Sequence, residues 1–389
     1  MRAAFALVWL LALMPHPATG LHVPHGFTLE AIAEVSGARE LAALPNGDLL
    51  VGTAGSDVQI VANAEGRVEP PQVFASFDDE LAAGVAFAAD RRSIYVGTEH
   101  HVWMIPYAGE KRATAVRRIA DVRTGSVAPG TDGDVHHTTS VVYSNGRLYV
   151  AAGSSCNARM SGGSAPCAEV DPTRAAVSVA SPDGSHLTQR AKRIRNAIAL
   201  AVNADTGSVW VGDAGQDDLP SGHPYEFLDD LSAHPGIADY GWPYCEENRR
   251  AYVASADCST TVIPLVVLPA YSTIIGAAFY PLHQRGAHAF PLGYRGGIFA
   301  AAHGSWHMQN GCHAQPPRVV FIGMHGDRPA RAVNWSNPIT QWTDFATGFQ
   351  SGCTTRIGRP TGIAVGAEGS LFIADDQAGL IYRVRPIRG

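Results

Sequence analysis

The chain has 389 residues, of which 46% are hydrophobic and 16% are charged, and its formal net charge is −6 at pH 7. This length suits one large domain or two medium ones, and the hydrophobic fraction is enough to bury a sizeable core. The negative charge argues against a dedicated nucleic-acid-binding protein, and the composition excludes collagen-like, coiled-coil and multi-span membrane proteins.

Residues 1–20 are predicted to be a secretory signal peptide. Arg2 supplies the positive start, Ala3–Met14 form an apolar run, and Ala18-Thr19-Gly20 offers small residues for cleavage. An uncleaved anchor or a buried helix is the alternative, but the run is too short to be a stable transmembrane anchor. We therefore expect a periplasmic or secreted protein with no membrane span after the signal is removed.

One pattern recurs six times along the chain: an apolar stretch, a polar turn with glycine, and a short strand rich in β-branched or aromatic residues. Each copy predicts a hairpin, with turns such as Asn46-Gly47, Asn145-Gly146 and Glu368-Gly369. The copies occupy residues 41–53, 85–98, 140–154, 198–215, 277–304 and 362–376. Six such copies favour a radial repeat, so residues 21–389 are predicted to form one all-β domain, a six-bladed β-propeller. A β-sandwich rarely repeats one hairpin six times, and a solenoid has a shorter period.

The six cysteines all follow the predicted signal, and an even number in an exported protein predicts disulfide bonds. Proximity in the sequence suggests the pairs Cys156–Cys167, Cys245–Cys258 and Cys312–Cys353, although six cysteines allow fifteen pairings. No C-x-x-C-H motif occurs in the sequence, so attached c-type haem is not expected.

Polar residues stand just before the first strand of several repeats, and radially equivalent positions would face one central channel. They are Arg39, His136, His137, Arg195, Asn196, Tyr271, Ser272, Thr273 and Arg359. Any one of them could simply cap a loop of its own blade, but the shared register favours a common site. Arginines that face one cavity call for an anionic partner, and a guanidinium group matches a carboxylate with two hydrogen bonds.

The chain also resembles a known family along nearly the whole mature sequence. The segments that carry the resemblance are PHGFTLEAIAEVSGARELAALPNGDLLVG, HHTTSVVYSNGRLYVAAGSSCN, RIRNAIALAVNADTGSVWVGD, DYGWPY, FPLGYRGGIFAAAHGSW and GRPTGIAVGAEGSLFIADDQAGLIYRV. In this order they resemble the glucose/sorbosone dehydrogenase family, and especially its sorbosone and pyranose dehydrogenase branch. The resemblance implies a six-bladed propeller that uses pyrroloquinoline quinone (PQQ) with a calcium ion.

The resemblance also implies roles for individual residues. His136 matches the histidine that deprotonates the substrate hydroxyl, and Arg195 matches the arginine that stabilises charge on the quinone oxygen. The implied cofactor-binding residues are Arg39, His137, Asn196, His303, Trp306 and Arg359, and the implied calcium-binding residues are Gly215, Gln216, Glu226 and Tyr240. Three features depart from the family pattern: Ala197 replaces a proline, Asp213-Ala214 replaces a longer acidic stretch, and His307–Gly311 replaces an Asn-Arg start.

We therefore predict an exported oxidoreductase that oxidises a sugar or polyol hydroxyl or aldehyde by hydride transfer to PQQ, assisted by Ca²⁺. Electrons would then pass to an external acceptor such as a cytochrome or quinone, because the chain has no haem motif. Two alternatives remain. One is a cofactor-free propeller that serves as an extracellular binding module, and the other is a calcium-dependent lactonase.

Overall fold

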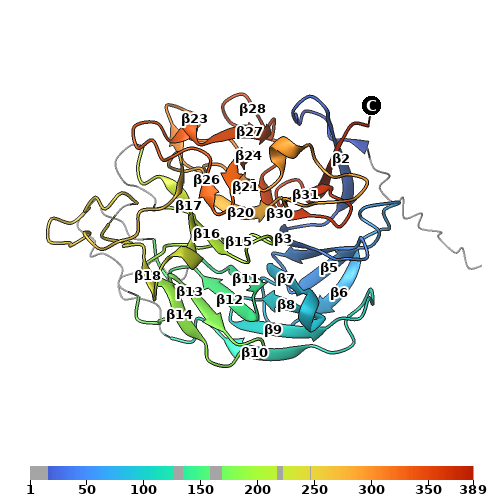
Figure 1. Cartoon of the computed structure of the whole chain (residues 1–389), viewed down its shortest axis with the longest axis horizontal. Helices are drawn as coiled ribbons and strands as arrows, with labels where there is room; N and C mark the ends of the chain where they lie inside the picture. The colour runs from blue at the N-terminus through green and yellow to red at the C-terminus, as the bar shows by residue number, and fades with distance from the viewer. Residues whose placement is uncertain (1–15, 126–134, 158–168, 217–221, 246, 389) are drawn as a thin grey trace, which may run out of the picture.

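The computed structural model describes residues 16–125, 135–157, 169–216, 222–245 and 247–388, and these residues form a six-bladed β-propeller (Figure 1). Each predicted hairpin is the innermost pair of strands of one blade. These pairs are β3 (Ala38–Ala43) and β4 (Leu49–Thr53), β7 (Gly84–Ala88) and β8 (Ser93–Gly97), β11 (Thr139–Ser144) and β12 (Arg147–Ala152), β15 (Ala199–Val202) and β16 (Val209–Asp213), β20 (Ile274–Phe279) and β21 (Ile298–Ala302), and β30 (Pro360–Val365) and β31 (Leu371–Asp375). We number the blades 1 to 6 in this order.

Outer strands complete each blade as an antiparallel sheet. Blade 1 adds β5 (Asp57–Val61) and β6 (Gln72–Ser76), blade 2 adds β9 (His101–Pro106) and β10 (Arg117–Asp121), and blade 3 adds β13 (Ala176–Ala180) and β14 (Thr188–Lys192), with β18 (Ala238–Asp239) parallel to β14. Blade 4 adds β17 (Glu226–Asp230) and β19 (Val266–Leu268), blade 5 adds β24 (Arg318–Ile322) and β27 (Trp342–Ala346), and blade 6 adds β32 (Leu380–Pro386), β2 (Phe27–Glu34) and β1 (His16–Pro17).

The six inner strands pack side by side around a central channel, in the closed order β3, β7, β11, β15, β20, β30 and back to β3 (Figure 1). Glycines permit this close approach. A Cβ atom at Gly276 of β20 would collide with the carbonyl oxygen of Thr361 on β30, and one at Gly362 would collide with the carbonyl oxygen of Arg39 on β3. The absence of a side chain at these positions therefore lets neighbouring blades meet at the axis.

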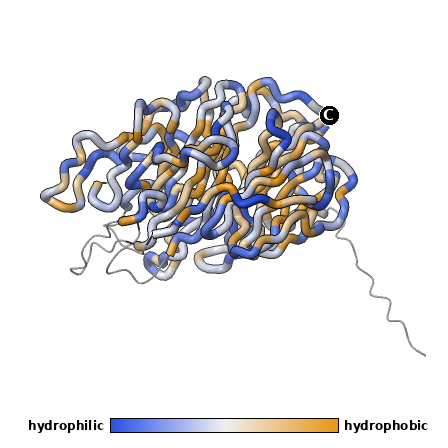
Figure 2. The backbone as a smooth tube through the Cα atoms, turned by 90° about the horizontal axis from the view of Figure 1, so that it is seen from below, coloured by the Kyte–Doolittle hydropathy of each residue, from blue (hydrophilic) through white to orange (hydrophobic). Residues whose placement is uncertain are grey.

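In five of the six blades the second strand of the hairpin is completely buried. Every residue of β4, β8, β16, β21 and β31 is buried, because adjacent blades cover both faces of the strand. These strands are largely apolar instead of alternating between apolar and polar residues, and their polar residues stand at a strand end. The hydropathy of the backbone tube follows the same arrangement, with apolar segments inside and polar loops outside (Figure 2).

The ring is closed by pairing the start of the described chain with its end. Strand β2 pairs antiparallel with β32, with Phe27 opposite Pro386 and Glu34 opposite Leu380. Phe27 also joins an aromatic cluster between blades 5 and 6, where its ring centroid lies 4.6 Å from that of Phe290. An N-terminal strand thus completes a sheet whose other main strands come from the C-terminal end.

Several short elements lie outside the main strands of the six blades. They are the two-residue strand pairs β22 (Met308–Gln309) with β23 (Cys312–His313), β25 (Met324–His325) with β26 (Arg328–Pro329), and β28 (Gln350–Ser351) with β29 (Thr355–Arg356), and the 3-10 turns η1 (Ala89–Arg91), η2 (Leu231–Ala233), η3 (Leu292–Tyr294) and η4 (Pro338–Thr340). Among the described residues, no helix combines the length and the apolar character needed to cross a membrane.

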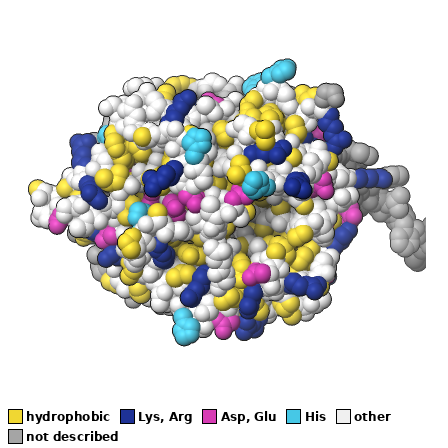
Figure 3. Space-filling view, viewed as in Figure 1, with side chains coloured by type: hydrophobic (Ala, Val, Ile, Leu, Met, Phe, Trp, Pro, Cys, Tyr) yellow, Lys and Arg dark blue, Asp and Glu magenta, His cyan; other side chains and the backbone are white. Residues whose placement is uncertain are grey.

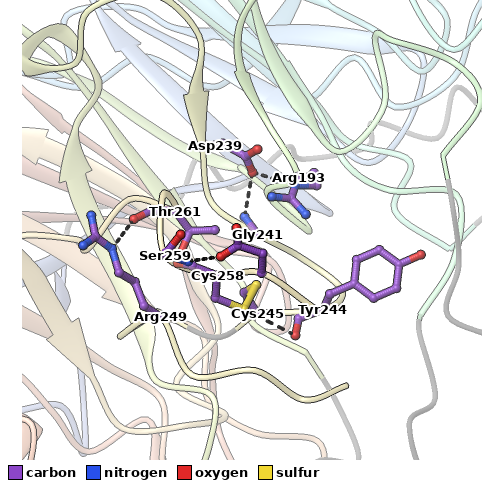
Figure 4. The surroundings of a disulfide bond; sticks show 10 residues. Arg193, Asp239, Gly241, Tyr244, Cys245, Arg249, Cys258, Ser259 and Thr261 are labelled. Carbon is purple, nitrogen blue, oxygen red and sulfur yellow. Dashed lines mark hydrogen bonds and ion pairs between the residues drawn. A yellow bond between two sulfur atoms is a disulfide. The ribbon is translucent and has the colours of Figure 1, made fainter. Parts of the chain in front are cut away.

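Two of the predicted disulfide bonds are confirmed. Cys245 is bonded to Cys258, in a loop that Arg249 anchors by donating to the carbonyl oxygen of Thr261 at 2.7 Å (Figure 4). Cys312 is bonded to Cys353, which ties the β22–β23 hairpin to the segment between β28 and β29. The third predicted pair includes Cys167, which lies outside the described residues, as do residues 1–15 of the predicted signal.

Candidate active site

The antiparallel hairpins bring two sets of polar residues to the same end of the channel. In each blade the start of the first strand lies opposite the end of the second, as in the pairs Ala199–Gly212 and Pro360–Asp375. Residues just before the first strand and just after the second therefore meet at one rim. Acidic, basic and imidazole side chains gather around the middle of the face shown in Figure 3.

A cavity of about 450 Å³ opens at this rim between blades 3, 4 and 5. Its lining consists of Val135, His136, Asn157, Arg195, Asn196, Ala214, Gly215, Glu226, Tyr271, Thr273, Ser305, Trp306 and His307. Six of the residues to which the family resemblance gives a role lie here: His136, Arg195, Asn196, Gly215, Glu226 and Trp306. Tyr271 and Thr273, of the set expected to face the channel, lie here as well. The volume is in the range of small-molecule sites, roughly 300–1,000 Å³.

His136 has a defined tautomer. Its Nδ1 lies 2.9 Å from the carbonyl oxygen of Ser154 and 2.8 Å from the Ser154 hydroxyl, which itself donates to the carbonyl oxygen of Cys156. A carbonyl oxygen can only accept, so the proton must be on Nδ1, and Nε2 carries the lone pair. Burial and then the positive charge of Arg195 hold the pKa of His136 well below its usual value. His136 is therefore a neutral imidazole at the wall of the cavity.

Arg195 lies in the same wall with only 5% of its surface exposed. Its Nη1 donates to the carbonyl oxygen of Ala214 at 2.7 Å, and its Nη2 donates to Oδ1 of Asn157 at 2.9 Å. Contacts on both sides fix the plane of the guanidinium group. The cavity thus has a rigid positive charge close to a neutral base.

Two buried carboxyl groups lie behind Arg195. Burial raises the pKa of Asp213 to about 7 and that of Glu226 to about 8. Asp213 accepts a hydrogen bond from the backbone N–H of Asn196 at 2.7 Å, and Glu226 accepts one from the N–H of Gly215 at 3.0 Å. The charge of Asp213 makes Glu226 harder to ionise, so this corner favours the addition of positive charge.

Aromatic rings form the outer edge of the cavity. The indole of Trp306 is stacked on the imidazole of His307 with 3.9 Å between ring centroids, and His307 meets the ring of Tyr271 at 4.7 Å. Trp306 remains 62% exposed, so it lies at the mouth of the cavity and is not part of the core.

Arg39, His303 and Arg359 lie outside the lining of this cavity and belong to a network around Asp376. Arg39 Nη1 contacts Oδ2 of Asp376 at 2.9 Å, and Nε2 of His303 contacts Oδ1 at 3.0 Å. Arg359 donates to the carbonyl oxygens of His303 and Gly304 at 3.0 and 2.8 Å. Arg39 therefore has an internal counter-ion, which the sequence analysis did not anticipate.

Burial and the charges within this network shift the pKa values of its titratable groups. Burial, followed by the charges of Arg359 and Arg39, lowers the pKa of His303 to about 4 against the opposing effect of Asp376. Burial also lowers the pKa of Arg359 to about 10. The hydrogen bond from His303 and the two arginine charges outweigh burial and lower the pKa of Asp376. His303 is neutral and Asp376 is ionised near neutral pH.

The remaining proposed residues lie outside the lining of the cavity, although Nε2 of Gln216 donates to Oδ1 of the cavity residue Asn157 at 3.2 Å. His137 contacts Oε1 of Glu99 at 2.6 Å through its Nδ1. Gln216 accepts a hydrogen bond from the indole N–H of Trp242 at 2.7 Å. Tyr240 donates to Asp229 at 2.8 Å, and that carboxylate and burial raise the pKa of Tyr240 well above its usual value. Gln216 and Tyr240 line a smaller cavity of about 30 Å³ behind blade 4.

Glu40 is a channel residue that the sequence analysis missed. It lines a narrow space of about 60 Å³ between the inner strands. The Ser140 hydroxyl contacts both Glu40 and the carbonyl oxygen of Ile198, the latter at 2.7 Å. The carbonyl must receive the hydroxyl proton, so the contact to Glu40 is satisfied when Glu40 itself is protonated. Burial raises the pKa of Glu40 to about 8, in agreement with this arrangement.

A larger cavity of about 580 Å³ lies elsewhere, beside β2 and β5. It is lined by residues 32–37, 53–57, 59 and 68–71, which include acidic groups but no histidine, arginine or lysine. Because it has neither a base paired with a cation nor an aromatic surface, we place the active site in the cavity between blades 3, 4 and 5.

Solved structures share this fold over nearly the full chain. The holo form of the PQQ domain of pyranose dehydrogenase from Coprinopsis cinerea is 18% identical, with a TM-score of 0.73, covering 95% of this chain and 98% of that one. The calcium structure of a Family AA12 carbohydrate-active enzyme from Trichoderma reesei is 18% identical, with a TM-score of 0.72 and coverages of 96% and 97%. A glucose dehydrogenase is 17% identical, with a TM-score of 0.63 and coverages of 93% and 100%. At these identities the likeness establishes the fold.

The match to one relative in sequence covers a smaller part of the chain. An uncharacterized protein of Borreliella burgdorferi is 26% identical over 195 residues, which are 49% of this chain. The chain spans about half the length of that relative, 47%.

The family itself is shown by a match over more than half of the sequence. The family model described as TrAA12-like matches residues 21–248, which contain blades 1 to 3 and the parts of blade 4 that carry Arg195, Asp213 and Glu226. The predicted resemblance to PQQ-type sugar dehydrogenase propellers is confirmed. The chain belongs to the TrAA12-like family.

Proposed function

We propose that the protein is an oxidoreductase that oxidises a hydroxyl or aldehyde group of a sugar or polyol, using PQQ and Ca²⁺. The observation that carries the proposal is the tautomer of His136. A neutral imidazole with its lone pair on Nε2 lines the same cavity as a fixed guanidinium group, Arg195. Such a pair suits removal of a hydroxyl proton beside a centre that gains negative charge. Family membership and the names of the similar structures support the same chemistry.

The cavity residues fit a flat, anionic cofactor. Arg195 offers positive charge in the wall, and Trp306 and His307 offer aromatic faces at the mouth. When bound, PQQ would supply a two-electron acceptor, which the amino acids of the chain cannot provide. Arg195 lines the cavity, whereas Arg39 and Arg359 lie outside its lining, so we assign the main cofactor contact in the cavity to Arg195.

Oxygen donors beside Gly215 fit a calcium ion. Glu226 lines the cavity, and burial raises its pKa to about 8, so a bound cation would favour its ionised form. Asn196 adds an amide oxygen to the same wall. Gln216 and Tyr240 are bonded to Trp242 and Asp229, so the calcium-binding role moves toward Glu226 and its cavity neighbours.

His136 and Arg195 would have different roles in the reaction. His136 would accept the hydroxyl proton at Nε2, and its Nδ1–H to Ser154 would hold the ring in position. Arg195 would stabilise negative charge inside the cavity, and Asn157 would keep its guanidinium group in place. The two disulfide bonds suit an oxidising compartment, so we propose a secreted or periplasmic location with an external electron acceptor.

A calcium-dependent lactonase is a second candidate. Asn157, Asn196 and Glu226 share the cavity, and this set could hold a metal that polarises a lactone carbonyl. The two functions differ in their need for PQQ, because hydrolysis requires no electron acceptor.

The test is reconstitution of metal-free protein with PQQ and Ca²⁺, followed by dye reduction with a panel of aldoses and polyols. We expect dye reduction that needs both additions, and a melting temperature that rises when both are present. A lactone panel without PQQ forms the second arm. Lactone hydrolysis without dye reduction would replace the dehydrogenase with the lactonase, and neither activity nor stabilisation would favour a binding module.

A further inference from the structure

A second cluster of ligand-type side chains lies at the rim of blades 2 and 3, outside the cavity. Asp79 precedes β7, Glu99 and His100 connect β8 to β9, and His137 precedes β11. Carboxylate or imidazole ligand atoms of Asp79, Glu99 and His100 all lie within 4.8 Å of one another, the one such group within the described part of the chain. We call these four residues the blade 2 cluster.

The cluster centres on one oxygen atom. Oε1 of Glu99 lies 2.6 Å from Nδ1 of His137 and 3.8 Å from Nε2 of His100, so two imidazoles approach it from different blades. We propose that Glu99, His100 and His137, together with Asp79, form a binding site for a divalent transition-metal ion of the Zn²⁺ class.

The donor chemistry selects the metal. Two imidazole nitrogens and two carboxylate groups suit Zn²⁺, Co²⁺ or Cu²⁺, whereas Ca²⁺ and Mg²⁺ prefer sites made of oxygen atoms. With neutral imidazoles the cluster carries two negative charges, which a divalent ion would balance. In a tetrahedral site with bonds of about 2.0 Å the ligand atoms are about 3.3 Å apart. The present distances of 2.6 and 3.8 Å bracket that value.

Part of the cluster is held rigidly and part can adjust. Oδ2 of Asp79 accepts hydrogen bonds from the Thr98 hydroxyl at 2.7 Å and from the backbone N–H of His100 at 2.8 Å. The same oxygen lies 2.9 Å from Nδ1 of His101. The side chains of His100 and His137 are 46% and 40% exposed, so both can rotate onto an ion from solvent. A metal ion could therefore enter from solvent and bind to the fixed carboxylate, and the exposed imidazoles could then turn toward it.

The test uses tag-free, chelator-treated full-length protein, titrated with Zn²⁺ by calorimetry and with Co²⁺ by ligand-field absorption. We expect one Zn²⁺ per chain at this site and a Co²⁺ spectrum of a four-coordinate centre. Glu99→Gln and His100→Ala should each weaken Zn²⁺ binding by at least about 10-fold. His325→Ala removes an exposed histidine of β25 that lies outside the cluster, and it should bind Zn²⁺ like the parent.

Excess Ca²⁺ should leave the Zn²⁺ affinity unchanged, because it prefers the oxygen donors near Glu226. Melting temperatures of the metal-free variants establish that each one folds. Binding that is equally strong in Glu99→Gln and His100→Ala, or no binding by the parent protein, would show that these residues form ordinary ion pairs. The readout is metal binding, so its outcome is independent of the proposed dehydrogenase activity.

Discussion

Nδ1 of His136 donates to the carbonyl oxygen of Ser154 over 2.9 Å, and this contact joins the segment before the first strand of blade 3 to the segment that follows its second strand. The bond decides which ring nitrogen is basic. A side chain that is oriented by its own blade can act on a substrate without reorganisation, which is where a general base gains its efficiency.

Replacing His136 with Asn should abolish most of the turnover in the reconstituted enzyme. General-base catalysis contributes roughly 10²–10⁴-fold, so we expect a loss of that size in kcat, while PQQ-dependent stabilisation remains. Steady-state dye reduction and melting curves measure the two effects. His325→Asn, at an exposed position far along the chain, is the matched control, and an unchanged kcat in His136→Asn would remove the base assignment.

Replacing Trp306 with Ala should affect the site without affecting the fold. The side chain is 62% exposed, and substitutions at such positions usually change the free energy of unfolding by less than about 0.5 kcal/mol. The lost stacking surface should raise KM for the sugar or weaken PQQ binding. Chemical denaturation combined with substrate titration separates these effects, and a large loss of stability would mean that Trp306 is a packing residue.

Breaking the contact between Asp376 and Arg39 should destabilise the propeller. The two side chains are about four-fifths buried, at 20% and 21% exposed, and Asp376→Asn leaves Arg39 with an unbalanced charge. We expect a loss of about 1–3 kcal/mol in the free energy of unfolding. Asp121→Asn breaks the exposed contact with Arg118 and should cost less than about 1 kcal/mol.

A double variant tests the coupling directly. Arg39→Met combined with Asp376→Asn should cost less than the sum of the single changes, because neither charge is then stranded. Strict additivity in denaturation experiments would contradict the proposed pairing.

Glu40 should make the stability of the protein depend on pH. Its pKa is raised from 4.5 to about 8 in the folded state, so the folded protein holds this proton while the unfolded chain releases it. Stability from this group is complete below pH 4.5 and is lost as the pH rises toward 8, by at most about 1.4 kcal/mol per pH unit. The nearby charge of Arg39 opposes the shift but is smaller than the effect of burial.

Glu40→Gln should remove this slope while keeping a hydrogen-bonding group beside Ser140. Free energies of unfolding measured from pH 5 to 9 should therefore fall more steeply for the parent than for the variant. Parallel curves would show that Glu40 is ionised in the folded protein.

The hairpin pattern was a sound guide to the fold because the inner strands are constrained from both sides. The hairpin predicted at residues 362–376 nearly coincides with β30 and β31. The second strand of this pair, β31, is entirely buried, and it is apolar up to Asp375 at its end. The outer strands are harder to predict. β10 carries Arg117 and Arg118 on a largely exposed edge, and its sequence has no strong strand signal.

The site was predictable in part for the same geometric reason. Residues before the first strands lie at one rim, but which of them share the cavity depends on loop packing that spacing does not encode. Asp376 was missed although it directly follows a second strand, as His303 does, and Glu99 was missed two residues after the end of β8. The pairing of Arg39 with Asp376 joins residues 337 positions apart, and no local pattern predicts it.

Closure of the propeller ring depends on the pairing of β2 with β32. Until that last sheet forms, β32 presents an unpaired edge of backbone N–H and C=O groups that can add a strand from another molecule. A fragment that lacks residues 27–34 should therefore pair this open edge of β32 with a strand of another molecule and give dimers or larger assemblies. An added peptide with the sequence FTLEAIAE should compete for the vacant edge and restore monomers.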